Sequence, residues 1–197
     1  RTSLLGMIAA KEAVESAAWQ TADLINAEPD EITFTSGATE AINLAIKGLI
    51  YQDRKHIITI QTEHKAVLET CRFMENIGFE VTYLPTRSDG ILDIQLLEDV
   101  ITDNTLVFIG MFSNNETGVI QNVSAISEIL KAKNVFFMCD ATQAVGKIPI
   151  DVKELGIDLL ALSAHKFYGP KGVGALYVSA KAKIKLQPQI LGGGQQK

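Results

Sequence analysis

Apolar and polar positions follow two different rhythms along this chain. Short apolar runs occupy 56–61, 105–112, 135–139 and 157–163, and each run ends at a polar cluster. Between such runs, apolar residues recur three and four positions apart, as they do after Gly37 at Ile42, Ala45, Ile46 and Leu49. The first rhythm predicts strands, and the second predicts amphipathic helices.

Strands and helices are expected to alternate over most of the chain. The pattern predicts strands near 31–35, 56–61, 80–85, 105–112, 135–139, 157–163 and 172–179, and helices near 11–26, 38–49, 65–78, 94–101 and 124–134. In the helix at 11–26, Val14, Ala18, Ala22 and Ile25 should form the inward face. This order predicts an α/β fold, a mainly parallel sheet covered by helices on both faces. Functional groups of such folds gather at the carboxyl ends of the strands.

Composition narrows the function classes. The chain has 197 residues, 47% of them hydrophobic, and a net charge of −5, which suits one large or two small globular domains. The most basic stretch, 181–187, is short and reads as a solvated face, so nucleic-acid binding is not expected. No apolar run reaches the roughly 18 residues of a membrane span, so no membrane association is expected. The first residue is Arg1, so the natural start is expected to be missing or processed.

Cysteine usage points to a reducing compartment such as the cytoplasm. The two cysteines, Cys71 and Cys139, lie far apart and form no CxxC pair. A disulfide framework and a zinc site are therefore not expected, and no other metal site is predicted.

Two predicted strands run into segments suited to ligand binding. After the strand at 31–35, "TSGATEA" passes through a glycine turn into a helix, whose free N–H groups and dipole would favour a phosphate, with Thr39 adding a hydroxyl. An equally good reading is a helix cap with the hydroxyl of Ser36 or Thr39. His64 follows the strand at 56–61, where an imidazole is structural or could stack on a flat ring and move protons.

Asp140 stands at the mouth of a strand that should be fully buried. A carboxylate there needs a partner, which could be a protonated ring nitrogen or a structural arginine. Gln143 lies one helical turn further on and could hydrogen-bond the same ligand.

The segment "SAHKFYGPKGVGALYV" places Ser163, His165 and Lys166 directly after a buried strand. A surface position is the ordinary reading of any one lysine, but here burial is expected, and burial favours the neutral, nucleophilic amine. Lys171 lies within the turn and is expected at the surface or beside a phosphate. A lysine amine that forms a Schiff base, a carboxylate for a ring nitrogen, an imidazole and a phosphate seat together describe a site for pyridoxal 5′-phosphate (PLP).

The same residues carry a family resemblance. The stretches "EITFTSGATEAINLAIKG", "TEHKAVLETC", "NNETGVIQ", "DATQAVGKIPID", "SAHKFYGPKGVGALYV" and "LGGGQQ" occur in this order and cover nearly the whole chain. Jointly they resemble the PLP-dependent cysteine desulfurases of the class V aminotransferase superfamily, most closely the NifS/IscS-like group. The resemblance implies the large domain of PLP fold type I.

The resemblance also implies roles for single residues. Lys166 would hold the cofactor covalently and shuttle the substrate's α-proton, and Asp140 would meet the pyridine nitrogen. Gln143 would contact the ring's phenolic oxygen. His64 would stack on the ring and act in proton transfer.

A second group of residues would hold the phosphate and the substrate. Thr39, Ser163 and His165 would bind the phosphate group. An asparagine of "NNETG" would face the substrate carboxylate and the ring oxygen, and both Asn114 and Asn115 are candidates, with Asn115 slightly preferred.

The implied reaction converts L-cysteine to L-alanine and leaves the sulfur as a persulfide on an enzyme cysteine. The persulfide would then supply iron–sulfur scaffold proteins and other sulfur acceptors, and the enzyme would be a homodimer. Residues 1–197 would form a partial cofactor-binding large domain without the C-terminal small domain and its persulfide cysteine, because neither Cys71 nor Cys139 matches that position. The fragment alone is therefore expected to be inactive. Alternatives are a selenocysteine lyase, another class V aminotransferase, or a non-catalytic PLP-binding remnant.

Overall fold

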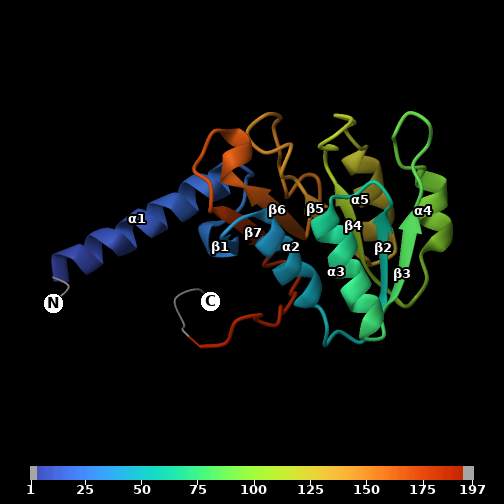
Figure 1. Cartoon of the computed structure of the whole chain (residues 1–197), viewed down its shortest axis with the longest axis horizontal. Coiled ribbons are helices and arrows are strands. Elements are labelled where there is room, and N and C mark those ends of the chain that lie inside the picture. The colour runs from blue at the N-terminus through green and yellow to red at the C-terminus, as the bar shows by residue number, and fades with distance from the viewer. Residues whose placement is uncertain (1–3, 193–197) are drawn as a thin grey trace.

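The computed structural model, which describes residues 4–192, contains one mixed sheet with helices on both sides (Figure 1). Its strands, in the spatial order of the sheet, are β1 (Ile32–Thr35), β7 (Gly174–Val178), β6 (Leu159–Ser163), β5 (Phe136–Asp140), β4 (Thr105–Met111), β2 (His56–Ile60) and β3 (Glu80–Leu84). Its helices are α1 (Leu4–Asp23), α2 (Ala38–Lys47), α3 (Lys65–Asn76), α4 (Ile94–Val100) and α5 (Val123–Ala132), with short 3-10 turns η1 (Pro29–Glu31) and η2 (Ala164–Phe167).

Most strand pairs are parallel. β3, β2, β4, β5 and β6 run in one direction, and only β7 runs antiparallel to both of its neighbours, β6 and β1. The predicted α/β fold with a mainly parallel sheet is thus confirmed. Because the five parallel strands share one direction, their carboxyl ends lie along one edge of the sheet, where ligand sites of this fold class form.

The core has two halves because side chains alternate across each strand. On one face, Phe137 and Leu160 pack in a cluster that also contains the inward residues of α4 and α5. On the other face, Met138 and Leu159 pack against α2 and α3. Strands buried on both faces explain why their sequences are continuous apolar runs.

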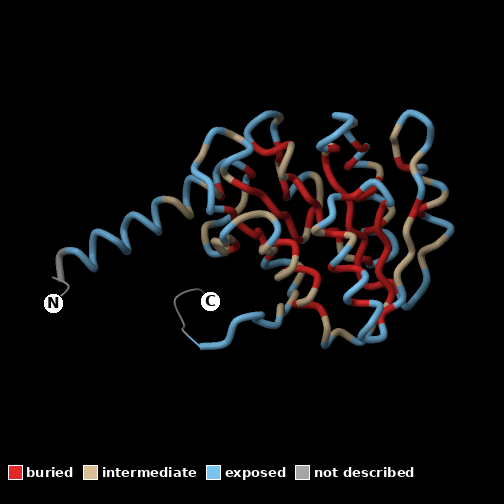
Figure 2. Tube along the Cα trace, viewed as in Figure 1, coloured by how far each residue is buried: buried red, intermediate tan, exposed pale blue. Residues whose placement is uncertain are grey.

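The N-terminal helix departs from the sequence prediction. It begins at Leu4, well before the expected start at 11, and Val14, expected in its inward face, is 58% exposed. Only the C-terminal end of this region packs on the body, through Ala22 and Ile25. Figure 1 shows α1 projecting from the sheet, and Figure 2 shows its pale, exposed surface. The predicted inward face is wrong at Val14, because none of the described segments packs against the first half of the helix.

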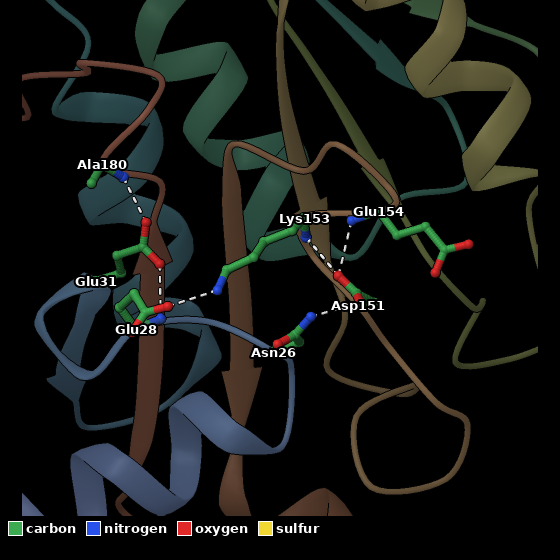
Figure 3. A network of polar contacts seen from close by, with 7 residues as sticks. All are labelled: Asn26, Glu28, Glu31, Asp151, Lys153, Glu154 and Ala180. Atoms are coloured by element: carbon green, nitrogen blue, oxygen red, sulfur yellow. Dashed lines mark hydrogen bonds and ion pairs between the residues drawn. The ribbon is translucent and has the colours of Figure 1, made fainter.

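A network of polar contacts fastens the end of α1 to the body (Figure 3). The Asn26 amide donates to Asp151 at 2.7 Å, and Lys153 donates to Glu28 at 2.7 Å. The buried Glu31 accepts from the Glu28 N–H and from a backbone N–H just after β7. Three segments distant in sequence are thereby held beside the edge strand β1.

Two further expectations from the sequence concern membrane-spanning helices and the motif "LGGGQQ". Within residues 4–192 there is no helix both long enough and apolar enough to cross a membrane. The closing motif "LGGGQQ" lies mostly outside the described residues.

Candidate functional site

A cavity of about 450 Å³ opens at the carboxyl ends of the parallel strands, beside the N-terminus of α2. Eight of the nine predicted site residues line it: Thr39, His64, Asn115, Asp140, Gln143, Ser163, His165 and Lys166. They come from segments up to 127 positions apart (166 − 39), and the parallel strands bring them to one edge of the sheet. The ninth residue, Asn114, does not line the cavity.

Asp140 ends β5 and is only 6% exposed. Its Oδ1 accepts hydrogen bonds from the backbone N–H and the hydroxyl of Thr142, the first at 3.0 Å. Its Oδ2 accepts no hydrogen bond from any residue between 4 and 192, and no ion pair of that region includes Asp140. The alternative of a structural arginine is therefore not realised there. A donor from a bound ring would complete the carboxylate's partners.

Lys166 lies on η2, the single 3-10 turn that follows β6, and lines the cavity. The burial expected from the sequence is wrong, because the residue is exposed. The physical reason is local: η2 is one short turn with no buried residue, and Tyr168 ends it in the left-handed region at φ 69°. The amine makes no hydrogen bond or ion pair with the described residues, so it is free for a carbonyl group.

His64 has a structural role and also lines the cavity. It is the N-cap of α3, and its Nδ1 accepts the Ala66 N–H at 3.1 Å. In the neutral ring the proton is therefore on Nε2, which is the nitrogen left to exchange protons with a ligand. The structural and functional readings of this histidine are compatible.

The N-terminus of α2 retains free N–H groups. Its N-cap is Gly37, and no side chain caps the helix, so the predicted alternative of a Ser36 or Thr39 hydroxyl cap is wrong. The Glu40 carboxylate instead accepts the Ser36 N–H at 2.6 Å, and the hydrogen bonds from Ser36 lower the pKa of Glu40. Thr39 lies on the first turn of α2, exposed and beside the cavity, where an anion would meet the helix dipole.

Two further predicted phosphate ligands lie opposite this helix. The Ser163 hydroxyl, at the end of β6, is 2.9 Å from Nδ1 of His165. Lys171, which the sequence predicts at the surface or beside a phosphate, lines the same cavity. Hydroxyl, imidazole and ammonium groups thus surround the space in front of α2.

Gln143 is half-buried, and its Oε1 accepts from the Lys147 ammonium at 3.0 Å. Its amide nitrogen is therefore the group available to donate toward a ligand oxygen in the cavity.

The two asparagines have opposite environments. Asn114 is buried; its amide donates to the Thr62 carbonyl at 3.0 Å, and its Oδ1 accepts the N–H groups of Glu116 and Thr117 at 2.9 Å. Asn115 is exposed and lines the cavity. Asn114 therefore shapes the turn, and Asn115 is the one that can reach a ligand.

Sequence reasoning missed two polar residues beside the site. Thr142 supplies both donors to Asp140, and the buried Glu63 bonds the Met111 backbone at the end of β4. Nothing in the apolar and polar pattern distinguishes Thr142 within "DATQ". The pattern also gives Glu63 no signal separate from that of its neighbour His64. Thr142 lines the cavity, and Glu63 reaches it only through Met111, which does line it.

The two cysteines are core residues. Both are fully buried and unpaired. Burial raises the pKa of Cys71 to about 12, and burial also raises the pKa of Cys139 well above its usual value. Neither is among the residues that line the cavity, so neither thiol is placed as a nucleophile there.

Taken together, the donor set fits PLP. A free amine, an incompletely bonded carboxylate, an imidazole with its proton on Nε2 and the N-terminus of a helix meet around one cavity of suitable volume.

Comparison with known proteins gives a consistent result. The sequence matches the family described as aminotransferase class-V over residues 5–197. It is 54% identical over 191 residues to cysteine desulfurase IscS of Proteus mirabilis (strain HI4320), covering 95% of this chain and 47% of that protein. The chain thus spans about half the length of the curated relatives it matches.

Solved structures resemble this fold closely. One is described as SspA in complex with cysteine, with a TM-score of 0.94 and 43% identity over 98% of this chain and 57% of that one. Another is the apo cysteine desulfurase from Thermococcus onnurineus NA1, with a TM-score of 0.90 and 29% identity over 98% of this chain and 49% of that one.

Proposed function

The chain belongs to the class V aminotransferase family, and on that premise we propose that it carries the PLP half-site of a cysteine desulfurase. The observation that carries the proposal is the shared cavity: Lys166, with a free amine, and Asp140, with an unbonded Oδ2, line the same 450 Å³ space. The curated relatives at 54% identity bear the name cysteine desulfurase, which supports this activity over others of the family.

PLP, when bound, supplies the electron sink that stabilises a carbanion next to an amine. Lys166 Nζ would hold the cofactor and would take the α-proton of the substrate. Asp140 Oδ2 would accept a hydrogen bond from the cofactor's ring nitrogen, and the Gln143 amide would donate one to a ring oxygen. The imidazole of His64 would lie against the ring and move a proton through Nε2.

The remaining residues orient the phosphate and the substrate. Thr39, Ser163 and His165, with the free N–H groups of α2, would hold the phosphate. Asn115 would face the substrate carboxylate, and Asn114 would support it by fixing the turn.

The proposed substrate is L-cysteine, which leaves as L-alanine. Its carbon–sulfur bond breaks, the sulfur passes to a cysteine thiolate as a persulfide, and the carbon side receives a proton. Because Cys71 and Cys139 are buried away from the cavity, the persulfide cysteine is neither of them. The proposed partners are iron–sulfur scaffold proteins and other sulfur acceptors. The enzyme is proposed to be a homodimer. Its proposed location is the cytoplasm, a reducing compartment that suits two free cysteines.

The test is cofactor capture. The purified chain incubated with PLP should acquire the yellow absorbance of lysine-bound PLP. Lys166→Ala should lose it, whereas the matched control Lys181→Ala, an exposed lysine that does not line the cavity, should keep it. Wild-type chain without this absorbance would overturn the proposal. Full-length protein that releases selenide but no sulfide, or that transaminates, would favour the selenocysteine lyase or aminotransferase alternatives.

A further inference from the structure

Glu63 is a buried carboxyl group that none of the roles above uses. It lies between β2 and α3, is 5% exposed, and its Oε1 accepts the Met111 N–H at 2.7 Å. Its Oε2 is fully buried and has no hydrogen-bond partner among the described residues. A carboxyl group in this state is costly when ionised, because one hydrogen bond cannot replace its hydration.

Among residues 4–192, the surroundings of Glu63 supply no positive partner. Glu63 interacts electrostatically with three titratable groups. These are Asp140 at the end of β5, the thiol of Cys139, which precedes Asp140, and the thiol of Cys71 on α3. His64, the next residue, directs its ring nitrogen to the Ala66 N–H. None of the ion pairs within residues 4–192 includes Glu63. Burial raises the pKa of Glu63 well above its usual value, the charge of Asp140 raises it further, and the Met111 hydrogen bond opposes both.

Glu63 and Asp140 are connected through the strand ends. Met111 donates its N–H to Glu63 and lines the cavity. It is also the register partner of Asp140 in the β4–β5 pair. The next residue, Phe112, donates its N–H to the Asp140 carbonyl at 2.9 Å. A displacement of Glu63 would therefore reach the backbone that carries Asp140.

The two carboxyl groups differ in their donors. Oδ1 of Asp140 receives two donors from Thr142, and its carboxylate opens to the cavity, whereas Glu63 receives one donor in a closed environment. Since two neighbouring carboxyl groups rarely both ionise, the proton belongs on the poorer-solvated one.

We propose that Glu63 is a positioning residue for the cofactor site: a neutral carboxylic acid that fixes the end of β4 at Met111 and leaves the negative charge on Asp140, facing the ring nitrogen. This inference rests on the proposed function, because a negative charge on Asp140 serves the site only when the ring nitrogen of PLP is its partner. The protonation of Glu63 itself can be measured without any cofactor.

The first test is infrared spectroscopy of the purified chain near neutral pH. A protonated carboxylic acid gives its own C=O stretching band. The band should be present in the wild type and in Asp140→Asn, and should vanish in Glu63→Gln. The control Glu128→Gln, an exposed residue of α5, should keep it. A band that vanishes in Asp140→Asn and persists in Glu63→Gln would place the proton on Asp140 and overturn the proposal.

The second test follows unfolding against pH. Because the pKa of Glu63 is raised in the fold, the fold is stabilised by the protonated form, and that stability is lost as the pH rises above the ordinary value of 4.5 toward the raised value. Urea titrations should show wild-type stability falling relative to Glu63→Gln across this window. A constant difference between the two proteins would contradict a proton held on Glu63.

The third test separates position from charge. Glu63→Gln keeps an acceptor for the Met111 N–H and should weaken PLP binding by less than about threefold, whereas Glu63→Ala orphans that N–H and should weaken it by about tenfold. Equal losses in both variants would contradict the positioning role. If the wild-type chain binds no PLP, the proposed function fails, while the infrared band still decides the protonation of Glu63.

Discussion

Neighbouring residues in this chain can have entirely different tasks, and Asn114 and Asn115 are the clearest pair. The sequence left both open as substrate ligands because a tandem "NN" in a turn gives no direction to either side chain. The structure turns Asn114 into the loop, where its amide and carbonyl groups are satisfied, and leaves Asn115 beside the cavity.

The asparagine pair gives a prediction that separates stability from binding. Asn114→Ala leaves the N–H groups of Glu116 and Thr117 without their acceptor and should lower the free energy of unfolding by roughly 1–3 kcal/mol. Asn115→Ala, an exposed change, should alter it by less than about 0.5 kcal/mol yet weaken binding of PLP and cysteine. Urea unfolding and ligand titration of both variants check this. Equal destabilisation by the two changes would contradict the assignment.

Some single-residue properties could not be predicted from the pattern. The residue types and positions of Lys166 and Asp140 follow from the polar clusters at the ends of apolar runs. The exposure of Lys166 does not, because it depends on a one-turn 3-10 segment and on Tyr168 adopting a positive φ, a conformation that tyrosine seldom takes. Glu63 is likewise invisible without the register that places Met111 opposite Asp140.

At the scale of elements, β7 connects the sheet to the N-terminus of α2, where the phosphate is proposed to bind. It is the antiparallel strand between β1 and β6, and its first residue, Gly174, lies against the N-terminus of α2. A Cβ added at Gly174 would lie 2.6 Å from the Gly37 Cα and 2.6 Å from the Leu162 carbonyl oxygen. Both neighbours are backbone atoms, which cannot rotate away.

Gly174→Ala should therefore displace the turn before α2. We expect a loss of roughly 1–3 kcal/mol in unfolding free energy, as for other overpacked sites, together with weaker PLP binding through the displaced N–H groups. The matched control is Val178→Ala at the other end of β7, which should reduce stability without affecting the cofactor. Calorimetry and PLP titration of both variants check this. Unchanged PLP affinity in a folded Gly174→Ala protein would contradict the packing argument.

The elements themselves were largely predictable, because apolar runs and 3.6-residue stripes have clear boundaries. β2, β4 and α3 begin at their predicted residues, 56, 105 and 65. The first helix is the exception. A stripe predicts an inward face only if something packs against it, and no described segment covers Val14.

At the scale of the whole molecule, the cavity proposed to hold PLP is lined by neither of the two cysteines. Both cysteines are buried, and burial raises the pKa of each thiol. The 197-residue chain supplied with PLP and L-cysteine should therefore bind the cofactor but form little alanine or sulfide. Alanine assays beside a full-length cysteine desulfurase check this, and turnover near that of the full-length enzyme would contradict it.

The central claim is that the amine of Lys166 holds PLP in the cavity shared with Asp140. The most direct measurement is borohydride reduction of the PLP-loaded chain, followed by proteolysis and mass spectrometry of the labelled peptide. The account predicts a pyridoxyl group on Lys166. A label on Lys171 or on another lysine, or no label in a chain saturated with PLP, would contradict it.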